Sequence, residues 1–151
     1  MKYLAVISVI LGLDLGMKNY IEKNVEDGEV REKPGRLLII RKHHNRGAFL
    51  NAGQHRQRMV AVLSLLMTLI LTIFFFLTLG TAGKGILKWG LTLLLGGAYS
   101  NTYDRLSRKY VVDYVSFNVP FGLRKIIFNI GDFCIIAGSL LVLLASFKEE
   151  I

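Results

Sequence analysis

Apolar residues are gathered into four long stretches of the chain, and polar residues fill the connectors between them. The stretches cover residues 3–20, 59–79, 85–100 and 126–147. A helix needs about 20 apolar residues to cross a bilayer, with a range of roughly 17–25, and loops or open sheet edges cannot face lipid. The third stretch is short, but a helix can continue past Tyr99 while Lys88 reaches the nearer surface. The pattern therefore predicts four transmembrane helices.

Two long polar connectors, 21–58 and 101–125, lie on either side of a tight turn at Thr81–Lys84. Leu37–Ile40 and Tyr110–Phe117 are rich in β-branched and aromatic residues, which favours strands. An even number of spans separates the connectors, so both lie on one side of the membrane and can pair. The sequence predicts a single polytopic membrane domain over residues 1–151, an all-α membrane protein with a small β-sheet built from the connectors.

The charges of the chain are concentrated in these connectors. The 151 residues are 52% hydrophobic with a formal net charge of +8, and the mean hydropathy is +0.44. Fourteen of the 19 basic residues lie in the two long connectors, which the positive-inside rule alone would place in the cytoplasm. Acidic residues alternate with them and no recognition motif appears, so we expect no nucleic-acid partner. Such a basic surface attracts anionic lipid headgroups.

Ionisable residues inside or beside the apolar stretches are the first functional candidates. Burying each one at membrane depth costs roughly 2.5–3.5 kcal/mol on insertion scales. Asp14 and Lys18 are four residues apart in the first stretch, so they can pair on one helix face, and we interpret them as an orienting ion pair. Asp132 lies in the fourth stretch, and Asp104 and Asp113 follow the third.

Two Asn-x-x-Asp motifs add amide groups to these acids. Asn101-x-x-Asp104 and Asn129-x-x-Asp132 each place an amide and a carboxyl on one face of a helix. Arg105 follows Asp104 directly, and we expect it to be the local partner that keeps this carboxyl ionised.

Asp113 and Asp132 are candidates for two carboxyls that meet at the membrane surface. Asp113 has no adjacent cation, and Asp132 is expected about a turn and a half into the fourth span. Two carboxyls within hydrogen-bond reach share a proton. The ionised one can activate water as general base while the protonated one polarises a carbonyl. From spacing alone, a packed polar network in a transporter fits equally well.

The remaining motifs point to no metal or organic cofactor. His43 and His44 are neighbours and cannot chelate one ion as an i,i+4 pair could, so with His55 they are predicted to be surface residues. No Gly-x-Ser-x-Gly elbow is present. The single cysteine, Cys134, cannot form an intramolecular disulfide and is predicted to pack inertly. Residues 96–98 are small and favour close helix packing.

Four blocks of the chain resemble signature segments of the signal peptidase II family. The two specific blocks are GGAYSNTYDRLSRKYVVDYVSF, residues 96–117, and FNIGDFCI, residues 128–135. The corresponding family patterns read roughly G-G-A-x-G-N-x-x-D-R, V-V-D-F and F-N-x-A-D. Two looser matches are LDLGMKNYI, residues 13–21, and NRGAFLN, residues 45–51. The blocks fall in family order over most of the chain, with four spans and the same loop lengths.

The resemblance implies an aspartic endopeptidase of the bacterial cytoplasmic membrane. Such an enzyme cleaves diacylglyceryl-modified prolipoproteins just before the lipidated cysteine and needs no cofactor. By the same resemblance, Asp113 and Asp132 match the catalytic pair. The supporting and substrate-binding positions are Asn101 and Asn129 beside that pair, Asp104 and Arg105 as structural and substrate-facing groups, Asn45 near the substrate, and Asp14 with Lys18 as the orienting pair.

The family orientation places both chain ends in the cytoplasm and the two connectors outside, as a cradle over the lipidated peptide. This contradicts the simple count of basic residues. We follow the family, because the first helix can set the topology and folded connectors are translocated despite their charge. The single set of motifs is compatible with a monomer surrounded by membrane lipids.

The chain departs from the family patterns at several positions. Ser100 stands where glycine is usual, Gly131 where alanine is usual, Tyr114 where phenylalanine is usual, and Lys109 where a glycine is expected. The Asn45 block is one residue short before Phe49, which affects the pose of Asn45 and the edge of the cradle.

Two other classes of function compete with the peptidase. One is a small transporter or channel subunit that moves protons on its intramembrane acids. The other is a non-catalytic relative that binds lipidated peptides or anionic lipid.

Overall fold

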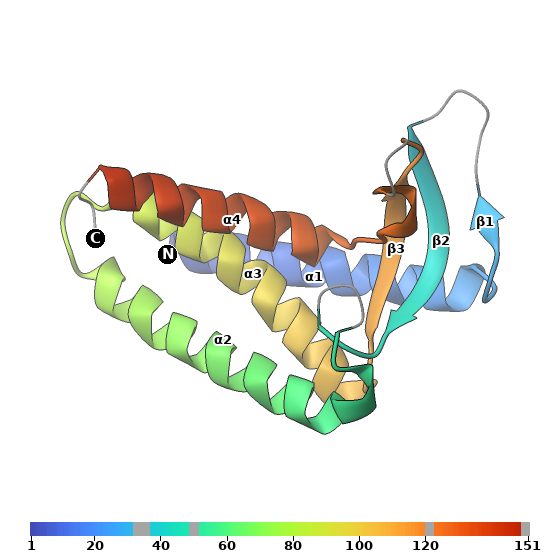
Figure 1. Ribbon diagram of the computed structural model, residues 1–151. Coiled ribbons are helices and arrows are strands. Elements are labelled where there is room, and N and C mark those ends of the chain that lie inside the picture. The colour runs from blue at the N-terminus through green and yellow to red at the C-terminus, as the bar shows by residue number, and fades with distance from the viewer. Residues whose placement is uncertain (32–36, 49–51, 120–122, 149–151) are drawn as a thin grey trace.

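A computed structural model describes residues 1–31, 37–48, 52–119 and 123–148. Within these ranges the chain forms four long helices and a three-stranded sheet at one end of them (Figure 1). The helices are α1 (Lys2–Asn24), α2 (Gln57–Leu79), α3 (Gly85–Ser107) and α4 (Ile130–Phe147). The strands are β1 (Val30–Arg31), β2 (Leu38–Asn45) and β3 (Val111–Phe117), and the short 3-10 turns are η2 (Gln54–Arg56) and η3 (Leu123–Lys125).

Three of the four predicted spans satisfy the requirements for crossing a membrane. The segments Lys2–Asn24, Gln54–Leu79 and Ile130–Phe147 are long and apolar enough by length and composition. The third predicted span is helical, but it is not among these three. Its helix, α3, packs against α1, α2 and α4, so little of its surface needs to match lipid. This central position allows α3 to carry buried polar residues such as Asn101 and Asp104.

Three helices start or end at residues that differ from the predicted stretches. α1 continues beyond residue 20 to Asn24. α3 continues past residue 100 to Ser107, as its expected extension beyond Tyr99 allowed. α4 begins at Ile130 rather than near Ile126. The residues just before it are extended because Phe128 forms a bridge with Val115 of β3, with backbone hydrogen bonds in both directions. Pairing with the sheet therefore competes with helix formation and delays the start of α4.

The two predicted strands exist and pair, as expected from the connectors. The antiparallel sheet has the order β1-β2-β3, and β2 extends beyond the predicted Leu37–Ile40 to Asn45. An irregularity between Ile40 and His43 shifts the β2–β3 register, so that His43 lies opposite Asp113. The sheet therefore brings residues of both connectors to the same place.

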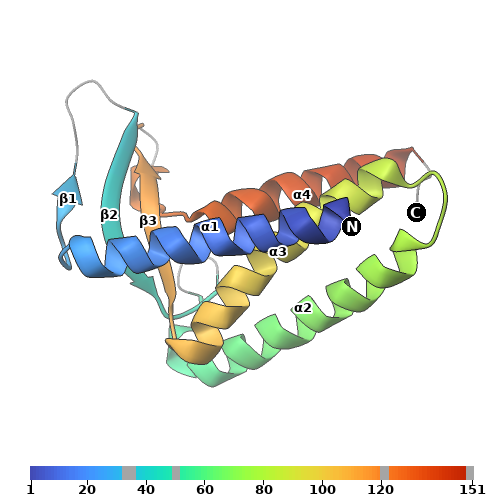
Figure 2. The same ribbon diagram turned by 180° about the vertical axis from the view of Figure 1, so that it is seen from behind.

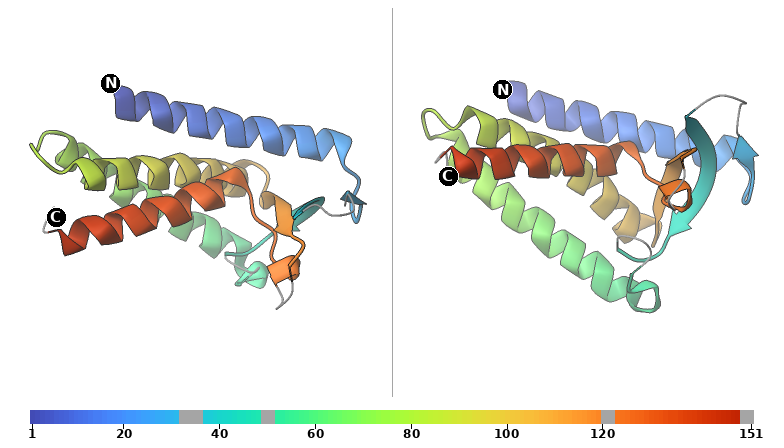
Figure 3. Two further views of the ribbon diagram at one scale, coloured as in Figure 1. Left: turned by 90° about the horizontal axis from the view of Figure 1, so that it is seen from above. Right: turned by 45° about the horizontal axis from the view of Figure 1, so that its top comes forward.

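The sheet lies at the opposite end of the helices from the start of α1 and the end of α4. Figures 2 and 3 show the start of α1, the end of α4 and the α2–α3 turn at the end farthest from the sheet. Val112 and Tyr114 of β3 pack with Ile21 and Val25 at the end of α1. This small apolar cluster fixes the sheet on the helices.

Glycines bring α3 unusually close to its neighbours, as the small residues at 96–98 predicted. A Cβ atom on Gly97 would collide with the carbonyl oxygen of Gly131 in α4, and one on Gly96 would lie 2.9 Å from Ile10 in α1. A second crossing point joins α3 and α4, where a Cβ on Gly138 would lie 2.6 Å from the carbonyl oxygen of Gly90. α3 therefore packs tightly against α4 at two points and against α1 at one.

Gly138→Ala is expected to destabilise the protein because its methyl group would press on the backbone of α3. Overpacking of this kind costs about 1–3 kcal/mol, so the thermal unfolding midpoint in detergent should fall. Gly12→Ala is the matched control, since a Cβ there meets nothing within 4 Å. Equal midpoints for the two variants would contradict this packing.

Candidate active site

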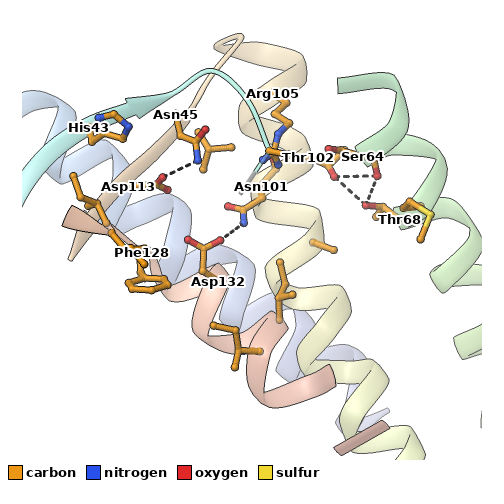
Figure 4. A pocket seen from close by; sticks show the side chains of 18 of the residues that line it. His43, Asn45, Ser64, Thr68, Asn101, Thr102, Arg105, Asp113, Phe128 and Asp132 are labelled. Carbon is orange, nitrogen blue, oxygen red and sulfur yellow. Dashed lines mark hydrogen bonds between the residues drawn. The ribbon is translucent and has the colours of Figure 1, made fainter. Parts of the chain in front are cut away.

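Asp113 of β3 and Asp132 of α4 line a single cavity of about 490 Å³. Figure 4 shows the two side chains directed toward the same space from different elements. Asp113 is only 2% exposed. Alternate residues of a strand face opposite sides. Its neighbours Val112 and Tyr114 pack against α1 instead. The strand thus presents one carboxyl to the cavity and apolar groups to the helices.

Asn129 connects the two carboxyls through hydrogen bonds. Its Nδ2 donates to Asp113 Oδ1 at 2.7 Å, and its Oδ1 accepts from the backbone N–H of Asp132 at 2.8 Å. The Asp132 carboxylate accepts from the backbone N–H of Asn129 at 3.1 Å, which completes a capping box. This arrangement corrects the sequence interpretation. Asn129 caps the helix rather than sharing its face, and Asp132 lies in the first turn rather than a turn and a half inside.

Two further asparagines occupy the remaining carboxylate oxygens. Asn45 Nδ2 donates to Asp113 Oδ2 at 3.1 Å, and Asn101 Nδ2 donates to Asp132 Oδ1 at 2.9 Å (Figure 4). All four carboxylate oxygens therefore accept an N–H group. Asn45 therefore reaches the site across the sheet. The predicted shortening of its block falls just before Phe49, which lies outside the described residues.

A buried ammonium group determines which way the amide of Asn101 faces. Lys18 is fully buried, and its Nζ contacts Asp14 at 2.8 Å and Asp104 at 3.2 Å. It also donates to Ser100 Oγ at 3.0 Å and to Asn101 Oδ1 at 2.8 Å. An ammonium can only donate, so the oxygen of Asn101 must face Lys18 and its NH₂ must face Asp132. The expected Asp14–Lys18 pair is present, as the centre of a larger cluster.

The expected pairing of Asp104 with Arg105 is wrong. Asp104 instead pairs with Lys18 and with Arg108 Nε, the latter at 3.0 Å, and it accepts from the backbone N–H of Val112. Successive residues of a helix point about 100° apart, so Arg105 is directed elsewhere. Its guanidinium lines the cavity and donates to the carbonyl oxygen of Gly47 at 3.1 Å.

The environment of Asp113 favours its protonated form. The pKa of Asp113 is raised to about 7, first because the carboxyl is buried and second because Asp132 lies nearby. Hydrogen bonds from Asn129 and Asn45 oppose this shift in part. A carboxyl pair that holds one proton near neutral pH can act as base and acid on the same substrate.

His43 is a cavity residue that the sequence analysis missed. It was predicted to be a surface residue with His44, but it is half-buried and lines the cavity opposite Asp113. Burial, and then the neighbouring His44, lower the pKa of His43, so its ring is neutral near pH 7. His44 points elsewhere, stacking on Tyr110 and bonding Glu22 at 2.8 Å. The shifted β2–β3 register places His43 opposite Asp113. The sequence does not show that register, so it could not identify His43 as a cavity residue.

The cavity changes character along its length. Near the sheet it is polar, whereas Met67, Leu71, Ile135 and Ile136 line it between the helices. α2 packs on α3 and diverges from α4 toward the sheet (Figures 1 and 2). A polar patch missed from sequence lies on the α2 side, where Thr68 and Thr102 hydroxyls are 2.9 Å apart. The space can therefore hold an extended polar group beside an apolar one.

Among the described residues, no group of three or more His, Cys, Asp or Glu side chains is arranged to hold a metal ion. Cys134 is half-buried in α4 and has a free thiol.

Lys18→Met should strongly destabilise the protein, because it leaves the buried carboxylates of Asp14 and Asp104 without their cation. Removing one partner of a buried ion pair costs about 3–5 kcal/mol, measurable as a lower unfolding midpoint in detergent. Glu29→Gln is the control, since it breaks an exposed pair with Arg31, and such pairs contribute about 0–1 kcal/mol. Similar midpoints for both variants would show that the buried carboxylates do not depend on the charge of Lys18.

Comparisons with known proteins assign the chain to a family. The family model described as Signal peptidase (SPase) II matches residues 6–148. The lipoprotein signal peptidase of Streptococcus pneumoniae is 32% identical over 155 residues, covering 100% of this chain and 98% of that protein. The one from Clostridium tetani is 33% identical over 106 residues, covering 70% and 67%.

Solved structures share the fold. Two structures determined by the in meso method and described as bacterial membrane enzymes match with TM-scores of 0.84 and 0.82. Their sequence identities are 24% and 25%, and the matches cover 98% and 97% of this chain and 88% and 93% of those chains. Since the family model spans nearly the whole chain and the curated relatives share its name, this protein belongs to the signal peptidase II family.

Proposed function

We propose that this protein is a membrane aspartic endopeptidase that removes the signal peptide from diacylglyceryl-modified prolipoproteins. The cut falls just before the lipidated cysteine. Family membership supports the substrate class. The observation that carries the aspartic mechanism is the pair Asp113 and Asp132, which line one cavity and are both hydrogen bonded to Asn129. A non-catalytic relative is not favoured, because both carboxyls are present.

In the proposed reaction, one ionised carboxyl and one protonated carboxyl act together. The ionised one takes a proton from water, whose oxygen attacks the scissile carbonyl carbon. The protonated one donates a hydrogen bond to the carbonyl oxygen as negative charge develops there. The C–N bond then breaks, and a proton passes to the leaving nitrogen. The products are a signal peptide with a new carboxylate and a lipoprotein with a free amine on its cysteine.

The shape of the cavity matches the two halves of such a substrate. Its apolar part, lined by residues such as Leu71 and Ile136, suits the apolar signal segment. Its polar part offers Arg105, Asn45 and His43 to the peptide groups around the cut. The acyl chains of the modified cysteine remain in lipid on the side where α2 diverges from α4 (Figure 1). The contacts of Asn101, Asp104, Asp14 and Lys18 with one another and with Asp132 support their proposed roles around the carboxyl pair.

We also propose the orientation in the membrane. All four helices cross the bacterial cytoplasmic membrane, both chain ends face the cytoplasm, and the sheet lies outside as a cradle. The separation of the sheet from the start of α1 and the end of α4 supports this arrangement (Figure 3). The acids also favour a peptidase over a proton carrier. Lys18, Asn101 and Asn129 join these four acids, Asp14, Asp104, Asp113 and Asp132, in one cluster near the sheet rather than leaving them distributed along the helices.

Asp113→Asn and Asp132→Asn should each abolish cleavage of a purified diacylglyceryl-modified prolipoprotein, while leaving the protein folded. A missing base or acid of this kind costs at least about 100-fold in rate. Cleavage is followed by gel shift and by mass spectrometry of the product. The control is Asp27→Asn, because that side chain is 77% exposed and pairs only with Lys42 among the described contacts. Near-normal turnover by a site variant would remove that residue from the mechanism.

The pH dependence of kcat/KM tests the shared proton. The pKa of Asp113 is raised to about 7, so the pair keeps a proton below that pH and loses it above. Since the mechanism needs one protonated carboxyl, kcat/KM should fall on the alkaline side of about pH 7, by about tenfold per pH unit. The apparent pKa belongs to the pair. A rate that keeps rising to pH 9 in folded protein would contradict the assignment.

A further inference from the structure

Tyr114 lies next to Asp113 in β3 but faces the opposite side of the strand. Its side chain is 2% exposed and packs with Ile21 and Val25 at the end of α1. Its hydroxyl donates to Asp14 Oδ1 at 3.1 Å and accepts from the backbone N–H of Ile130 at 3.2 Å. One side chain therefore contacts both α1 and the first residue of α4.

The contact with Ile130 completes the N-terminal cap of α4. The first N–H groups of a helix have no partner within the helix. The side chain of Asn129 accepts from the N–H of Asp132, and the carboxylate of Asp132 accepts from the N–H of Asn129. The N–H of Ile130 is bonded by neither of these groups and finds its acceptor in Tyr114. The start of the helix that carries Asp132 is thus held from two sides.

The direction of the hydrogen bonds at Tyr114 is fixed by chemistry. Asp14 is paired with Lys18 at 2.8 Å, and an ionised carboxylate only accepts. The tyrosine must therefore donate to Asp14, which leaves its oxygen free to accept from Ile130. Burial, and then the charge of Asp14, raise the pKa of Tyr114, so the hydroxyl keeps its proton. Asp14 is itself held by a 2.6 Å hydrogen bond from Ser100.

We propose that Tyr114 is a positioning residue whose hydroxyl ties Asp14 to the first amide of α4 and so sets Asp132 relative to Asp113. Asp113 is placed by the backbone of the same strand, and Asp132 by the helix start that the hydroxyl holds. The inference rests on the proposed function, because it concerns the geometry of that carboxyl pair. Ser100 and Tyr114 are both departures from the family patterns, and both of their hydroxyls donate to the same carboxylate.

Tyr114→Phe removes this hydroxyl and keeps the packing of the ring. With the lipidated prolipoprotein as substrate, kcat should fall about tenfold, which corresponds to roughly 1.4 kcal/mol of barrier, and KM should stay unchanged. The matched control is Tyr99→Phe, which removes a tyrosine hydroxyl bonded to Thr72 at 2.7 Å between α3 and α2. This control should stay within about twofold of the original kcat. An unchanged kcat in Tyr114→Phe, or an equal loss in the control, overturns the proposal.

Amide hydrogen exchange at Ile130 gives a readout that needs no activity. In Tyr114→Phe the N–H of Ile130 loses its acceptor and should exchange faster, whereas exchange in Tyr99→Phe should match the unmodified protein. Unchanged exchange in Tyr114→Phe overturns the proposal whatever the kinetics show. If the unmodified protein cleaves and Tyr114→Phe behaves normally in both measurements, the proposed function stands and the inference fails. If the unmodified protein does not cleave, the proposed function fails. Exchange at Ile130 then still tests whether the Tyr114 hydroxyl holds the first amide of α4.

Discussion

The buried ammonium of Lys18 is the interaction on which the rest of the site depends. A charge with no access to water must be surrounded by acceptors, and here four oxygens from α1 and α3 contact it. Because the ammonium only donates, it turns the amide of Asn101 so that its NH₂ faces Asp132. The same cation holds Asp14, which in turn accepts from Tyr114. A single buried charge therefore orients groups on three other elements.

Tight and open packing have separate places in this fold. Glycines such as Gly97 and Gly138 bring α3 and α4 into backbone contact, so the elements that carry the polar cluster have little freedom to shift. α2 diverges from α4 on the other side (Figure 1), and the cavity lies there with apolar walls and a polar end. The arrangement keeps the carboxyls of Asp113 and Asp132 in fixed positions while leaving room for a membrane-embedded peptide beside them.

Most helices and strands of the fold could be predicted from the sequence. Several contacts of the site could not, and each failed for its own physical reason. Long apolar stretches indicated the helices, and β-branched runs indicated β2 and β3. The predicted start of α4 was wrong because Phe128 pairs with β3, and the local sequence pattern does not encode such a long-range contact. The partner of Asp104 was wrong because sequence neighbours on a helix diverge, and Arg105 faces the cavity. His43 was missed because its position depends on a register irregularity in the sheet.

The most direct test of the central claim is a structure of the protein with a lipidated peptide whose scissile bond is replaced by a hydroxyl-bearing tetrahedral mimic. The hydroxyl is expected to lie between Asp113 and Asp132, within hydrogen-bond distance of both carboxyls. The apolar segment of the peptide is expected to follow the cavity along α2 and α4. A mimic bound outside this cavity, or in contact with neither carboxyl, would contradict the claim that these two residues perform the cleavage.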